Sequence, residues 1–153
     1  MPLFKPNYIK MINDYLWRFN RLGPLNDQGF CEVTKGTARI GINVLPDENY
    51  LILRSGFMRI PKENPLPFFR KLLVLNFRDT LDAFFSIDDE RDMVFVNLRR
   101  PLEGLDYEEF ARSLIIVAEV SDQYDKPLIE EFGSEEDRAM YALKELMARG
   151  GKE

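Results

Sequence analysis

The stretch KLLVLNFRDTLDAFFSIDDERDMVFVNL, residues 71–98, decides the fold class because its apolar pattern changes from helical spacing to strand-like segments. The first part belongs to a predicted helix over residues 65–76. Residues 83–88 and 93–98 are apolar-rich and are separated by acids, which predicts a β-hairpin. One face of the helix is expected to carry Phe69, Leu72, Leu73 and Asn76.

The acidic cluster between the two strands has two interpretations. Asp88, Glu90 and Asp92 have the i, i+2, i+4 spacing of a calcium-binding loop. That loop also needs Gly at its sixth position and Glu at its twelfth, and Met93 and Arg99 stand there instead. The cluster is therefore interpreted as a solvated hairpin turn, and no metal ligand is expected.

Asn76 interrupts a nearly continuous apolar run. A buried amide without hydrogen-bond partners costs about 1–3 kcal/mol, so its side chain must find partners. We interpret it as an anchor that fixes the end of its helix to neighbouring backbone. The alternative is a small-molecule or enzymatic pocket formed with Arg78 and Asp79, which would need further convergent polar groups.

Composition limits the classes of function. The chain has 153 residues, is 45% hydrophobic and carries a net charge of −5. These values fit one globular domain over residues 1–153 and argue against a partner that is a nucleic acid or an anionic membrane. The chain has no histidine and a single cysteine, Cys31, which removes the commonest general base and metal ligand. We expect a cytoplasmic protein without catalytic residues, cofactor or metal.

The remaining elements complete the fold class. Helices are predicted over residues 7–22 and 134–149, and a long helix starts at Asp106 and is bent or ended by Pro127. Strands are predicted over residues 30–35, 38–44 and 50–60, the last bent near Ser55-Gly56. The order α-β-β-β-α-β-β-α-α predicts an α+β sandwich, in which helices pack on a five-stranded antiparallel sheet.

The chain has more apolar residues than one sheet face and its helices need. If Val94, Val96 and Leu98 face the core, Met93 and Phe95 face away from it. Exposed apolar patches mark association surfaces, so a partner-binding surface and a dimer interface are expected, unless the last helix folds across the excess. The predicted partner-binding residues are Tyr50, Ile52, Phe84, Met93 and Phe95, and the predicted dimer interface is Ile115, Ile116 and Val120.

Four segments of the chain resemble a known family: LLVLN (72–76), AFFSID (83–88), VFVNL (94–98) and LDYEEF (105–110). Together with the order of elements over residues 7–132, they are similar to the YbjN family, which shares its fold with CesT-like type III secretion chaperones. The last helix lies outside this resemblance. It implies an α+β sandwich, a homodimer, no enzyme activity and a chaperone-like or regulatory role in which apolar patches bind an extended partner polypeptide.

Overall fold

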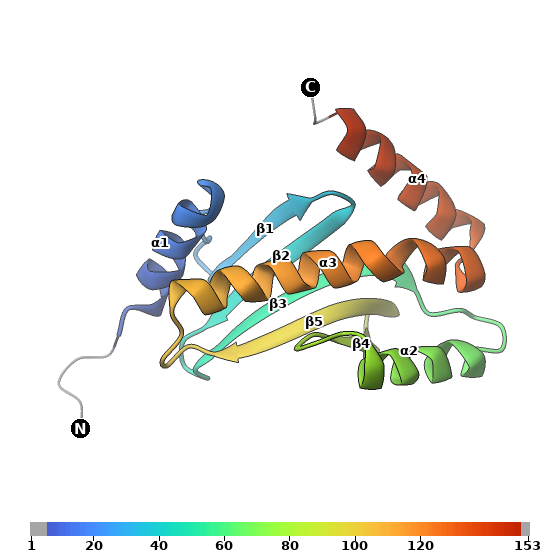
Figure 1. Cartoon of the computed structure of the whole chain (residues 1–153), viewed down its shortest axis with the longest axis horizontal. Coiled ribbons are helices and arrows are strands. Elements are labelled where there is room, and N and C mark those ends of the chain that lie inside the picture. The colour runs from blue at the N-terminus through green and yellow to red at the C-terminus, as the bar shows by residue number, and fades with distance from the viewer. Residues whose placement is uncertain (1–5, 151–153) are drawn as a thin grey trace.

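The computed structural model describes residues 6–150 of the chain (Figure 1). Over this range the elements follow the predicted order. They are α1 (Tyr8–Asn20), β1 (Phe30–Lys35), β2 (Ala38–Leu45), β3 (Tyr50–Arg59), α2 (Leu66–Arg78), β4 (Phe84–Asp88), β5 (Met93–Pro101), α3 (Tyr107–Phe132) and α4 (Glu135–Gly150).

The five strands form one antiparallel sheet in the order β1-β2-β3-β5-β4, so that β1 and β4 are its edges. The long helix α3 runs along one face and contacts β2, β3 and β5, while α1 packs beside it and α2 lies next to β4 (Figure 1). We call the opposite face of the sheet the outer face. This arrangement confirms the predicted α+β fold with an antiparallel five-stranded sheet.

Alternation along the strands builds the core. On β2, Ile40 and Ile42 are buried toward α3, whereas the residues between them are more exposed. The predicted bend in β3 is confirmed as a register irregularity between Gly56 and Met58. At this irregularity the neighbouring side chains of Phe57 and Met58 are both buried, because the bulge shifts the alternation by one residue.

The acidic cluster is the turn of the β4–β5 hairpin, as predicted. The Asp88 carboxylate oxygen Oδ1 accepts hydrogen bonds from the backbone N–H groups of Glu90, at 3.1 Å, and Arg91, at 3.2 Å. Asp92 adopts a positive φ of 57°, which a short polar turn residue tolerates. The spacing of the acids therefore reflects turn geometry.

The long helix α3 starts as predicted, and Pro127, which was expected to bend or end it, lies inside it. The Asp106 carboxylate caps it by accepting the Glu109 N–H at 2.8 Å. Pro127 does not end the helix, which continues to Phe132. The last turn is held by Leu128 and Ile129, which are buried in the core, and this burial outweighs the hydrogen bond that proline removes.

The last helix, α4, starts at a reciprocal cap. Ser134 Oγ accepts the Asp137 N–H at 3.1 Å, and the Asp137 carboxylate accepts the Ser134 N–H at 3.0 Å. No residue of α4 is buried, and the helix lies beside the end of α3 and the turn between β1 and β2 (Figure 1). It therefore does not fold across the apolar excess of the sheet, and it exposes apolar residues of its own: Met140, Leu143, Leu146 and Met147.

Candidate functional site

The five predicted partner-binding residues all lie on the outer face of the sheet. Tyr50 is exposed, and the other four side chains are half-buried. The register brings Phe95 opposite Gly56, whereas Tyr50 pairs with Pro101 at the other end of the sheet. Ile52 and Phe95 line a hollow of about 480 Å³. The outer face thus holds one group of these residues, with Tyr50 apart from it.

Gly56 on β3 leaves room for the Phe95 ring on the outer face of the sheet. A Cβ atom at Gly56 would lie 2.9 Å from Phe95 Cε1 and 3.3 Å from Met93 Cε, both too close for ordinary contact. The Arg54 guanidinium carbon lies 5.5 Å from the centre of the Phe95 ring, which allows a cation–π interaction. Phe95 and Met93 are half-buried because they rest on this glycine.

The predicted dimer residues lie on α3. Ile116 and Val120 are each only 4% exposed, and Ile115 is half-buried. The helix packs against three strands, α1 and α4, which accounts for its apolar character on most sides. Side chains that are already buried within one chain have little surface left for a second one. Their role in a dimer stays a prediction, and the large exposed apolar surface lies elsewhere.

That surface is the outward side of α2, which the sequence analysis missed. Leu73 is 69% exposed and Phe77 is 88% exposed, because the helix packs inward through Phe68, Leu72 and Leu75. The expectation that Leu73 shares the inner face with Leu72 is therefore wrong. The spacing of Leu66, Leu73 and Phe77 was the available signal. We define the α2 surface as Leu66, Leu73, Val74, Phe77 and Leu81.

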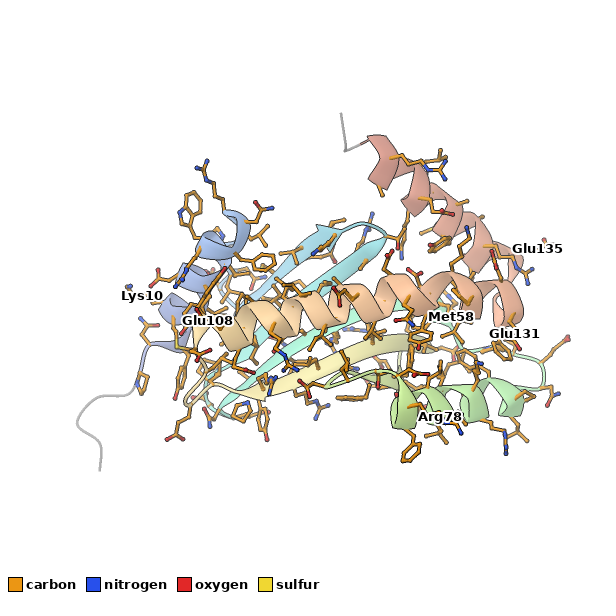
Figure 2. The ribbon with its side chains drawn as sticks, in the orientation of Figure 1. Lys10, Met58, Arg78, Glu108, Glu131 and Glu135 are labelled. Atoms are coloured by element: carbon orange, nitrogen blue, oxygen red, sulfur yellow. The ribbon has the colours of Figure 1, made fainter. Side chains whose placement is uncertain are left out.

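The α2 surface borders a broad hollow of about 860 Å³, which is also lined by Arg70 and Arg78. Figure 2 shows Arg78 at the C-terminal end of α2. The helix contains Arg70, Lys71 and Arg78 but no acidic residue. The surface therefore combines exposed apolar side chains with positive charge on a chain whose net charge is −5.

Asn76 anchors the end of α2, as predicted. Its side-chain Nδ2 donates to the Phe85 carbonyl at 3.2 Å, and its Oδ1 accepts the Phe85 N–H at 2.7 Å. Both ends of the amide are thus committed to the backbone of β4. The alternative pocket would need this amide for a ligand, and the structure gives it another use.

The free edge of β1 has a different character. In an antiparallel pair, every second residue directs its backbone N–H and C=O toward the neighbouring strand. Gly29 is in this phase, because its carbonyl accepts the N–H of Val44 on β2 at 2.8 Å. Glu32 and Thr34 therefore direct their N–H and C=O groups away from β2, where no hydrogen bond joins them to any described residue. A groove of about 250 Å³ lies beside this edge, and its apolar lining is Phe19, Leu22, Val33, Ile40 and Leu114.

A buried acid lies where α4 meets the turn between β1 and β2. Asp125 on α3 is 3% exposed, and it accepts hydrogen bonds from Thr37 Oγ1 at 2.8 Å and from the Lys126 N–H. Burial raises the pKa of its carboxyl to about 6, although both hydrogen bonds lower it. Burial also raises the pKa of Tyr141 on α4 to about 12, with Asp125 as the next cause.

None of the helices within residues 6–150 is long and apolar enough to span a lipid bilayer. Solved structures with a similar fold include the ExsC–ExsE complex, with a TM-score of 0.64, 16% identity, and coverage of 84% of this chain and 97% of that chain. The ExoU–SpcU complex of the type III secretion system of Pseudomonas aeruginosa gives a TM-score of 0.61 at 20% identity, covering 77% and 97% of the two chains.

YbjN from E. coli gives a TM-score of 0.51 at 16% identity, covering 79% of this chain and 96% of that chain. These likenesses establish the shared fold and confirm the resemblance drawn from the sequence. A search of the curated proteins finds no match. The CesT_Tir_1 family matches residues 5–130, a range that includes the sheet, α1, α2 and most of α3 and leaves α4 outside. The chain belongs to the CesT_Tir_1 family.

Proposed function

We propose that the protein is a non-enzymatic, chaperone-like or regulatory protein that acts as a homodimer and binds a partner polypeptide. Membership of the CesT_Tir_1 family supports this proposal, as does the likeness to a chain of the ExsC–ExsE complex and to a chain of the ExoU–SpcU complex. The observation that carries it is the β1 edge, where unpaired backbone groups lie beside an apolar groove.

An extended segment of the partner would join the sheet at β1. The backbone groups of Glu32 and Thr34 would supply the hydrogen bonds, because they point outward from the edge. Alternate side chains of an added strand would point toward the groove beside Val33. Outer-face residues Ile52, Phe84, Met93 and Phe95, with Tyr50, form a second proposed contact surface for the same partner.

A proline substitution at Thr34 distinguishes binding of the partner at the β1 edge from binding elsewhere on the protein. The Thr34 N–H faces away from β2, so Thr34→Pro removes an outward donor and leaves the β1–β2 ladder intact. The polypeptide that co-purifies with the tagged protein from its native cells would be titrated calorimetrically. We expect binding to weaken about tenfold or more with Thr34→Pro and to be unchanged with Thr34→Val, which keeps the N–H. Equal affinities for both variants would contradict binding at this edge.

The proposed dimer uses the α2 surface. Burying Phe77 and Leu73 against a second copy would remove two well-exposed apolar side chains of α2 from water. We expect Phe77→Asp to give a monomer in multi-angle light scattering, while Trp17→Asp, on exposed α1, leaves the dimer intact. A dimer that survives Phe77→Asp and is lost with Ile115→Asp would move the interface back to α3.

A further inference from the structure

Hydrogen bonds within the chain occupy several of the outward backbone groups along the β4 edge. Phe85 pairs with Val96, and its N–H and C=O both bind the Asn76 side chain, so they face away from β5. By alternation, Ala83 and Ile87 also direct their backbone groups outward. The Ala83 N–H binds the Thr80 carbonyl at 2.9 Å. Along this edge, only Ile87 has both groups without a hydrogen bond to the described residues.

We infer that Asn76 closes the β4 edge by standing in for a sixth strand, so that polypeptide can be added to the sheet only at β1. A carboxamide presents one donor and one acceptor side by side, as a peptide group of a neighbouring strand does. It satisfies both groups of the central edge residue, and α2 covers the strand around it. The part of this inference that concerns a partner strand rests on the proposed function, and the closure itself does not.

A comparison of the β1 and β4 edges shows why the single residue Asn76 is enough to close β4. On β1, Asn26 plays a similar part at the start of the strand: its Oδ1 accepts the Phe30 N–H at 3.0 Å, and its own N–H donates to the Phe30 carbonyl at 2.7 Å. Beyond it, the outward backbone groups of Glu32 and Thr34 both stay open. On the β4 edge, the closed residue is the middle one of the outward-facing residues 83, 85 and 87, and the single open residue beyond it is too little for a strand to pair with.

The donor and acceptor of the Asn76 carboxamide restrict which residues at position 76 could close the β4 edge. Asp at position 76 would still accept the Phe85 N–H, but its second oxygen would face the Phe85 carbonyl and repel it. Ala would leave both groups of Phe85 unpaired at an edge, and unpaired strand edges recruit other strands.

The test needs no partner polypeptide, because it measures association of the protein with itself. We expect Asn76→Ala to associate beyond the wild-type size in a concentration-dependent way in sedimentation velocity, and the Phe85 amide to exchange at least about tenfold faster with deuterium. Adding Ile87→Pro, which removes an outward N–H and no ladder bond, should abolish the new association without restoring thermal stability. Wild-type size for Asn76→Ala at all concentrations, or association that persists with Ile87→Pro, would overturn the inference.

A second variant covers the case in which Asn76→Ala does not fold. Asn76→Asp keeps the acceptor for the Phe85 N–H and regains a donor only when the new carboxyl is protonated. We expect this variant to associate at pH 7 and to return to the wild-type size near pH 4, with wild-type protein measured at both pH values as the control. Association that does not depend on pH would count against the closure.

Discussion

The helices α2 and α3 are both rich in apolar residues, and their surroundings differ. On α3, Ile116 and Val120 are buried because strands and other helices surround it. On α2, the side next to β4 is buried, while Leu73 and Phe77 face solvent. An apolar helix therefore indicates an association surface only where its neighbours leave it uncovered. Substitutions on the two helices, and removal of α4, test this difference.

The largest effect is expected on α3. Ile116→Ala removes buried methyl and methylene groups and leaves a cavity, so the free energy of unfolding should fall by about 2–5 kcal/mol. Urea denaturation followed by circular dichroism measures this change. A loss below about 1 kcal/mol would mean that Ile116 is not packed in the core of its own chain.

The buried acid on α3 should make stability depend on pH. The pKa of Asp125 is about 6 in the folded protein, above its ordinary value of 3.8, so the folded state holds the proton more tightly. The resulting stabilisation is present below pH 4 and is lost as the pH rises through 6. At pH 7, Asp125→Asn should therefore raise the free energy of unfolding by about 1–3 kcal/mol. Urea titrations between pH 4 and 7 should show a flatter profile for the variant, and parallel profiles would contradict the shifted pKa.

The helix α4 extends the comparison to a helix without buried residues. A chain ending at Gly133 loses α4 but no fully buried side chain, so its free energy of unfolding should change by less than about 1 kcal/mol. Its Asp125 carboxyl should become more exposed and lose part of its pKa elevation, which carboxyl NMR titration would detect. A destabilisation of several kcal/mol would show that α4 is part of the core.

The smallest effect on folding is expected on α2. Leu73→Ala, the counterpart of Ile116→Ala, should change the free energy of unfolding by about 0.5 kcal/mol or less. The measurement belongs at the lowest workable protein concentration, because an assembly through α2 would itself stabilise the folded chain. A loss as large as that of Ile116→Ala at this concentration would remove the distinction between the two helices.

Local sequence patterns predicted the elements well, because each depends on neighbouring residues. The hairpin followed from two apolar segments around an acidic turn, and the role of Asn76 followed from the cost of an unpaired buried amide. The continuation of α3 through Pro127 could not be predicted in this way. It depends on core contacts of Leu128 and Ile129, which come from distant parts of the chain.

The surfaces were harder to predict than the elements, for the same reason. A helical pattern shows that Leu72 and Leu73 are apolar, but the packing of α2 against β4 decides which of them is buried. On α3, the number of elements packed around the helix decides how much apolar surface is left for a partner, and that number is a tertiary property. The open β1 edge and the closed β4 edge likewise depend on the order of the strands in the sheet, which decides which backbone groups face outward.

The difference between the open β1 edge and the closed β4 edge would set the number of partner strands that each protomer binds. With one edge open, each protomer can take up one added strand, and a symmetric dimer would carry two at equivalent positions. A sheet with two open edges could also join its own copies end to end, and each addition would leave a new edge for the next. The single carboxamide at the end of α2, which closes one of the two edges, would therefore prevent copies of the sheet from joining end to end.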